Sequence, residues 1–345
     1  MTRRRYLVFG LISAALATSV MVVALVVVDV ALHARYQRWA GYNVWGYRGP
    51  VAGPKRAGER RVVVIGGSTA FGYGVAWDQA FPAVLERKLQ AARGAPVSVV
   101  NLGWNNEGAH AFLPTLRDYR YLEYDVALLY EGYNDLGGPG SNRRLFRRDS
   151  AIFRLTGYLP IFPLVAREKA LALLHGGDLD AAFRPRNDGR VVFTPRVADR
   201  LQAFTLTMAA DVSAALERQI GHLSRAEMDK APIDGEAPTG CHGFWREYCG
   251  SVTAAVGELV AHGRSAVVVT QPYISDGHLD QQRALRGLLA ARFGADPRVR
   301  YVNLGPAVDL RDPALVLDGM HLSASGNDRI AGALVPHLLQ VLGAR

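Results

Sequence analysis

The sequence predicts an α/β protein built on a parallel sheet that helices wrap on both faces. Short continuous apolar runs, helical apolar spacing between them and the alternation of the two support this fold class. With 345 residues, of which 49% are hydrophobic and 21% charged, the chain can bury a sizeable core. We therefore expect a folded domain preceded by a separate N-terminal segment.

The N-terminal segment is basic and then apolar. Three arginines lie within residues 1–5, and residues 6–28 carry no charge. Such a run crosses ~30 Å of hydrocarbon, whereas a cleaved signal peptide has an apolar region of about 7–15 residues. We expect an uncleaved single-pass transmembrane anchor at 6–28, a cytoplasmic N-terminus at 1–5 and a linker at 29–59. Arg35 and Arg38 lie beyond the anchor and weaken this charge asymmetry without reversing it.

This orientation predicts a protein of the bacterial inner (cytoplasmic) membrane, with the rest of the chain on the periplasmic, extracytoplasmic side. Strands are expected where short runs of apolar residues suit burial on both faces. They fall at residues 62–65, 97–100, 125–130, 265–270 and 300–302. Helical patterns fall at residues 81–92, 252–262, 280–293 and 325–342.

The alternation of predicted strands and helices stops between about residues 137 and 245. This stretch holds an apolar patch at 152–174 and a long amphipathic segment at 198–228, with no obvious strand. We interpret it as a mostly helical insertion within a domain that spans 60–345. It could cover the site as a lid, or face a membrane or a partner.

The net charge of +9 comes almost entirely from arginine. One local run contains Arg143, Arg144, Arg147 and Arg148, which we expect on a solvated surface. Nucleic-acid binders combine a basic face with base-stacking aromatics or a known reading motif. The sequence has neither, so we expect no nucleic-acid partner.

The two cysteines also favour an exported domain. Cys241 and Cys249 bracket a short loop that a disulfide could close. Free thiols and a metal site that adds His242 are the alternatives. Two thiols and one imidazole without a further nearby ligand are a weak zinc pattern. The spacing therefore favours a disulfide, and we expect no metal and no cofactor.

Polar or small residues follow the first three predicted strands. Ser68 follows the first strand, Gly103 the second and Asn134 the third. Ligands of an open parallel sheet bind outside the carboxyl ends of its strands, where these residues converge. Acyl transfer needs hydrogen-bond donors at the developing oxyanion. The backbone N–H of Ser68, the N–H of Gly103 and the side-chain amide of Asn134 would supply three.

A base for Ser68 is expected near the C-terminus. Asp318 and His321 lie just before the final predicted helix, and their spacing lets the carboxylate reach imidazole Nδ1. Nε2 then faces the serine, which needs a base to become a nucleophile. Taken singly, Ser68 could be a helix cap, Gly103 and Asn134 turn residues, and Asp318 a loop carboxylate. Their occurrence together, in this order and at strand ends, favours a catalytic role.

This constellation resembles the SGNH subgroup of the GDSL-type hydrolases. The matching blocks are Gly66-Gly67-Ser68, Gly103, Gly132-Tyr133-Asn134-Asp135 and Asp318-Gly319-Met320-His321. The similarity covers roughly residues 60–135 and 250–342. The usual Gly-Asp-Ser is Gly66-Gly67-Ser68 here, which removes the acidic neighbour of the serine.

The resemblance implies a flavodoxin-like three-layer α/β/α sandwich and a metal-free serine esterase. Ser68 would be the nucleophile, His321 the base and acid, and Asp318 its orienting partner. Ser68, Gly103 and Asn134 would form the oxyanion hole. For an anchored, exported enzyme we expect O-acyl, such as acetyl, esters of envelope glycans or lipids as substrates.

Several alternatives remain at this point. The same triad could transfer acyl groups to envelope polysaccharide, or the domain could be an inactive binding module. An α/β-hydrolase nucleophile elbow is disfavoured because the serine lies on the first strand and the acid three residues before the histidine. The glycines near Ser68 do not give the dinucleotide-binding pattern.

Overall fold

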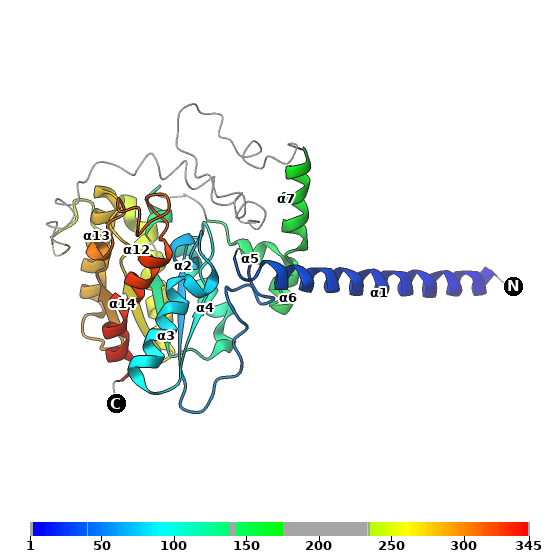
Figure 1. The fold of residues 1–345 in the computed structure, drawn as a ribbon, viewed down its shortest axis with the longest axis horizontal. Helices are drawn as coiled ribbons and strands as arrows, with labels where there is room; N and C mark the ends of the chain where they lie inside the picture. The colour runs from blue at the N-terminus through cyan, green and yellow to red at the C-terminus, as the bar shows by residue number, and fades with distance from the viewer. Residues whose placement is uncertain are drawn as a thin grey trace.

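The computed structural model describes residues 3–39, 41–130, 132–138, 143–174, 233 and 235–343. Five parallel strands form one sheet in the order β2-β1-β3-β4-β5, with helices on both faces (Figure 1). This confirms the predicted parallel α/β sandwich. The strands are β1 (Arg60–Gly66), β2 (Val97–Asn101), β3 (Val126–Tyr130), β4 (Ser265–Val269) and β5 (Val299–Val302).

The sheet is buried because its strands are almost wholly apolar. β1 is an interior strand: Val64 pairs with Asn101 of β2 on one side and with Leu128 of β3 on the other. Every residue of β3 is buried, as expected for a strand covered by helices on both faces. The strand order reverses at β1, so the carboxyl ends of β1, β2 and β3 meet at the topological switch point.

Two groups of helices cover the sheet. α3 packs on α14, and α12 packs on α4 and on α13. Their bounds are α2 (Ser68–Phe71), α3 (Phe81–Arg93), α4 (Phe112–Asp118), α12 (Arg246–Ala261), α13 (Asp276–Phe293) and α14 (Ala324–Leu342). Short 3-10 helices are η1 (Trp77–Gln79), η2 (Ala109–Ala111), η3 (Arg120–Leu122), η4 (Tyr133–Asp135), η5 (Gly243–Trp245) and η6 (Gly305–Ala307).

α1 (Arg3–Tyr36) projects from the domain as one continuous helix (Figure 1). Its most apolar window has a mean hydropathy of 2.7 and no buried residue, so by length and composition the helix can cross a membrane. α1 runs eight residues into the predicted linker, because no proline or glycine interrupts residues 29–36. Asp29 and His33 in this last part are buried against the domain.

The described part of the predicted insertion is helical at its start. It contains α5 (Phe146–Asp149), α6 (Ala151–Thr156) and α7 (Phe162–Leu174). The amphipathic segment expected at 198–228 lies outside the described residues. At the other end of the insertion, Cys241 and Cys249 form a disulfide with their Cα atoms 5.9 Å apart.

Candidate active site

Ser68 begins a helix directly after β1. β1 ends at Gly66, where a Cβ would lie 2.0 Å from the Tyr130 carbonyl oxygen, so only glycine allows β1 to approach β3 this closely. Gly67 is the N-cap of α2, and no side chain caps that helix. Ser68 is therefore not the N-cap residue, and its hydroxyl has another partner.

That partner is His321. The Nε2 atom of His321 lies 2.8 Å from Ser68 Oγ across 253 positions of sequence. Its other ring nitrogen, Nδ1, lies 2.7 Å from Asp318 Oδ2. The structure thus joins a hydroxyl, an imidazole and a carboxylate in the order found in serine catalytic triads.

The loop before α14 holds Asp318 in place. Its second carboxylate oxygen, Oδ1, accepts the backbone N–H of His321 at 2.7 Å and that of Met320 at 3.1 Å. Burial alone would raise the pKa of Asp318, but the charge and hydrogen bonds of His321, aided by the Met320 N–H, lower it. The carboxylate stays charged at neutral pH and accepts a hydrogen bond from Nδ1 of His321, so Nε2 is the ring nitrogen that faces Ser68.

The His321 side chain is shielded from water. His321 is buried, and the Tyr73 ring packs against its imidazole with the ring centroids 4.7 Å apart. Ser68 itself is 8% exposed. Exclusion of water strengthens the hydrogen bonds along the Ser68–His321–Asp318 chain.

Gly103 lies directly after β2, as predicted. Its N–H donates to the side-chain Oδ1 of Asn101 at 3.0 Å. A Cβ at this position would lie 2.6 Å from the Phe71 nitrogen, so the glycine allows the loop after β2 to touch α2. The role of Gly103 as an oxyanion donor stays a prediction.

Asn134 lies in η4, directly after β3, as predicted. Its side-chain amide donates one hydrogen bond to the Glu107 carbonyl oxygen at 3.0 Å. A carboxamide nitrogen carries two hydrogens, and this bond fixes the plane of the amide. The role of Asn134 as an oxyanion donor stays a prediction.

Gln271 is a residue that sequence reasoning missed. Its Oε1 accepts the Tyr133 N–H at 2.9 Å, and its Nε2 donates to the Thr69 hydroxyl. Gln271 is buried and thereby connects the neighbour of Ser68 to the neighbour of Asn134. It lies just past the carboxyl end of β4, so the same strand-end reasoning could have found it.

Buried Arg48 holds the loop beside Ser68 in place. Arg48, from the predicted linker, donates to the carbonyl oxygens of Phe71 at 2.8 Å and Gly72 at 2.7 Å, at the C-terminal end of α2. Burial lowers the pKa of Arg48 to about 9, so the guanidinium keeps its charge at neutral pH. The linker is therefore a structural part of the site.

In the arginine run, Arg143 and Arg144 are exposed, as the sequence predicted, but Arg147 is buried. Arg147 is 3% exposed, donates through Nε to the Gly46 carbonyl oxygen at 2.9 Å and lies over the Trp104 ring. Arg148 pairs with Asp118. The prediction was wrong for Arg147 because a guanidinium can be buried where several carbonyl oxygens accept its hydrogens.

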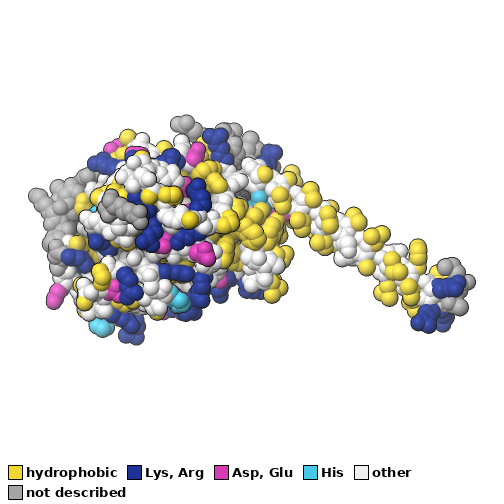
Figure 2. All heavy atoms as spheres, turned by 90° about the horizontal axis from the view of Figure 1, so that it is seen from below, with side chains coloured by type: hydrophobic (Ala, Val, Ile, Leu, Met, Phe, Trp, Pro, Cys, Tyr) yellow, Lys and Arg dark blue, Asp and Glu magenta, His cyan; other side chains and the backbone are white. Residues whose placement is uncertain are grey.

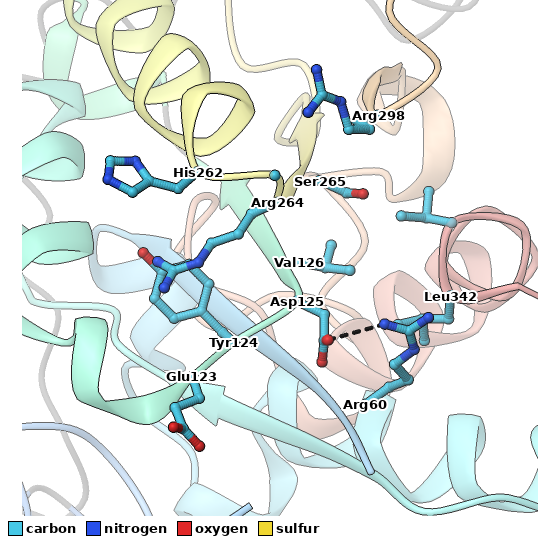
Figure 3. Close-up of a pocket in the computed structure, with 12 residues that line it drawn as sticks. Arg60, Glu123, Tyr124, Asp125, Val126, His262, Arg264, Ser265, Arg298 and Leu342 are labelled. Carbon is cyan, nitrogen blue, oxygen red and sulfur yellow. Dashed lines mark hydrogen bonds and ion pairs between the residues drawn. The ribbon is translucent and has the colours of Figure 1, made fainter. Parts of the chain in front are cut away.

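A second polar cluster lies at the opposite, amino ends of the strands. It lines a cavity of about 480 Å³ that includes Arg60, Asp125, Arg264 and Arg298 (Figure 3). Asp125 accepts hydrogen bonds from Lys55 and Arg60. Among the described residues, no group of three or more His, Cys, Asp or Glu is arranged to hold a metal ion.

No family model matches the chain, and no curated protein matches its sequence. Solved structures are similar to it. A lipase/acylhydrolase from Enterococcus faecalis is 12% identical over 83% of this chain and 98% of its own, with a TM-score of 0.43. A psychrotrophic esterase from Pseudoalteromonas sp. is 10% identical over 82% and 98%, also with a TM-score of 0.43.

An acetyl xylan esterase from Geobacillus stearothermophilus is 14% identical over 83% of this chain and 95% of its own, with a TM-score of 0.41. At these identities and TM-scores the similarity assigns neither residue roles nor substrates to this chain.

Proposed function

We propose that the protein is a serine ester hydrolase of the SGNH type. The observation that carries this proposal is the continuous hydrogen-bonded chain from Asp318 through His321 to Ser68, with distances of 2.7 and 2.8 Å. A hydroxyl within hydrogen-bond reach of an imidazole that a carboxylate orients can act as a nucleophile. The position of Ser68 at the switch point of the sheet leaves it where a substrate of this fold class binds.

The reaction follows from these positions. Ser68 Oγ attacks the ester carbonyl carbon while His321 Nε2 takes the hydroxyl proton. The tetrahedral intermediate collapses, and the alcohol leaves with that proton from Nε2. Water then loses a proton to Nε2, attacks the acyl-enzyme and releases the acid, which restores Ser68.

The proposed donors for the oxyanion are the three predicted positions. Two are the Ser68 backbone N–H at the start of α2 and the Asn134 amide. The third is the Gly103 N–H, which would exchange its bond to Asn101 Oδ1 for one to the oxyanion. Gln271 positions the first two donors relative to each other through Thr69 and Tyr133.

The proposed location is the extracytoplasmic face of a bacterial inner membrane, with α1 as the anchor. The apolar length of α1 and the disulfide between Cys241 and Cys249 support this location. Its proposed substrates are O-acyl esters of envelope glycans or lipids, since those are the esters that an anchored domain can reach.

The test is hydrolysis of p-nitrophenyl esters of short and long acyl chains by the purified full-length chain. We expect turnover of at least one ester. Adding an oligosaccharide acceptor then separates hydrolysis, in which the acid appears, from acyl transfer, in which an acylated sugar appears. A folded protein that turns over none of these donors, with or without acceptor, would contradict the proposal.

A further inference from the structure

The length of α1 determines which part of the domain reaches the membrane. The 23 uncharged residues from Tyr6 to Val28 span about 35 Å as a helix, and the hydrocarbon core is about 30 Å thick. The helix has no break before Tyr36. Asp29 therefore lies within a few ångströms of the hydrocarbon boundary on the domain side.

Asp29 is fastened directly to the start of α7. Its Oδ1 accepts the backbone N–H of Ile161 at 2.9 Å and of Phe162 at 2.5 Å, and its Oδ2 accepts the Tyr158 hydroxyl at 2.6 Å. One turn later, His33 bonds the Leu159 carbonyl oxygen at 2.8 Å. The first turn of α7 consequently sits at the same depth as Asp29, without a flexible joint between them.

The surface at this depth is apolar and exposed. We define the α6–α7 platform as Ile152, Leu155, Phe162, Leu173 and Leu174. Leu155 is 85% exposed, Leu173 82% and Leu174 79%. These values are unusual for leucine in a folded domain, and the exposed Trp45 lies beside Gly157, directly after α6. Hydrophobic side chains gather where α1 meets the domain (Figure 2), and α7 runs across α1 rather than along it (Figure 1).

The charges of the same segment fit a lipid surface. Residues 151–174 contain Arg154, Arg167 and Lys169 against one acidic residue, Glu168. The three basic side chains belong to exposed residues. Apolar residues interleaved with Lys and Arg are typical of helices that lie in the interface plane of an anionic bilayer.

We propose that the α6–α7 platform lies in the headgroup and upper acyl region of the same membrane leaflet at which α1 emerges. The inference depends on the proposed anchor, because α1 fixes the depth. The membrane covers the leucines that would otherwise face water. α1 and the platform together hold the domain in one orientation on the bilayer, rather than leaving it on a flexible stalk.

The test uses the full chain in vesicles of phosphatidylcholine and phosphatidylglycerol. Both native cysteines are in the disulfide, so a single introduced cysteine can be labelled with a bimane fluorophore. Probes at Leu155→Cys and Leu173→Cys report the platform, Leu16→Cys reports the anchor, and Ala291→Cys on the exposed surface of α13 is the distant control. Lipids with a quencher near the headgroup or deep in the acyl chain are added in turn.

We expect the platform probes to be quenched several-fold more than the Ala291 probe, and most strongly by the shallow quencher. The Leu16 probe should respond to the deep quencher. If the Leu16 probe is quenched but the platform probes behave like the Ala291 probe, the anchor holds and the platform inference is wrong. If Leu16 is not quenched either, the anchor itself fails, and the inference with it.

The result would differ if a second copy of the chain or another protein covered the platform instead of lipid. In that case the platform probes would change emission with protein concentration and not with quencher lipid, which would also overturn the proposal. Ester hydrolysis by each labelled protein is measured in parallel. It separates loss of fold from loss of membrane contact, and a failure of the esterase proposal from a failure of the platform.

Discussion

The two ends of the central sheet both carry polar clusters, but they are arranged differently. At the amino ends, the Asp125 carboxylate accepts hydrogen bonds from Lys55 at 2.8 Å, Arg60 at 3.0 Å and the Arg61 N–H at 2.7 Å. At the carboxyl ends, the bonds from Asp318 run through His321 and terminate on a hydroxyl. A closed set of ion pairs stabilises a fold, whereas a directed chain that ends on a nucleophile can do chemistry.

The carboxyl groups of the two ends also differ in their pKa. Near the carboxyl ends, burial raises the pKa of Glu107 to about 7, although Arg147 opposes the shift. Near the amino ends, burial acts against Glu59 too, but hydrogen bonds from Ser98, Arg56 and Arg61 lower its pKa to about 2. A buried carboxyl group with few hydrogen-bond donors therefore has a raised pKa, whereas one with many donors has a lowered pKa.

The largest predicted difference comes from replacing one serine by alanine at each end of the sheet. Ser68→Ala removes the nucleophile, and we expect kcat/KM for a p-nitrophenyl ester to fall by about 10³-fold or more. Ser98→Ala removes hydrogen bonds to Glu59 and Arg61, and we expect a loss of about 1 kcal/mol of unfolding free energy with an unchanged rate. Equal rates for the two variants would mean that the ends do not differ in function.

The second prediction compares the same substitution at two carboxylates, one at each end of the sheet. Asp318→Asn keeps the shape but lets His321 adopt the wrong tautomer, so we expect kcat to fall by about 10²- to 10⁴-fold. Asp125→Asn weakens three hydrogen bonds and should lower the unfolding free energy by about 1–2 kcal/mol while kcat stays the same. Steady-state kinetics and urea denaturation of both variants check this. A kcat loss in Asp125→Asn alone would reverse the assignment of the two ends.

The smallest predicted effect is a pH dependence of opposite sign. Glu107 has a raised pKa, so the folded state binds its proton more tightly, and stability falls as pH rises from about 4.5 to 7. Glu107→Gln should match the parent near pH 5 and melt a few degrees higher at pH 8.

Glu59 has a lowered pKa, so its contribution is present above about pH 4.5 and is lost as pH falls toward 2. Glu59→Gln should melt below the parent at pH 8, with a deficit that shrinks below about pH 5. Melting curves between pH 2 and 8 check both variants. Parallel pH profiles would contradict the contrast between the two carboxyl groups.

The fold was predictable because the five strands are short apolar runs, and each was placed within about two residues of its observed bounds. Helix starts were predicted less well. α13 begins at Asp276 rather than at 280, because Ser275 caps it by accepting the His278 N–H at 3.2 Å. A polar cap is not part of the apolar pattern, so a prediction from periodicity alone places the start of the helix too late.

The candidate site was predictable where strand ends and short spacing decide the geometry. Ser68 and His321 meet because a parallel sheet brings the end of β1 next to the loop before α14. The burial of Arg147 depends on a loop far away in sequence, because its Nε donates to the Gly46 carbonyl oxygen. No local pattern encodes this contact, so the exposure of Arg147 was predicted wrongly.

The nucleophilic character of Ser68 is tested most directly by covalent trapping. The full-length chain is incubated with a p-nitrophenyl phosphonate ester, whose phosphorus reacts with an activated hydroxyl and releases p-nitrophenolate. Peptide mass mapping then locates the phosphonyl group. We predict one adduct, on Ser68, and a much slower reaction in His321→Ala. An adduct on another residue, or equal labelling of Ser68→Ala, would contradict the proposed site.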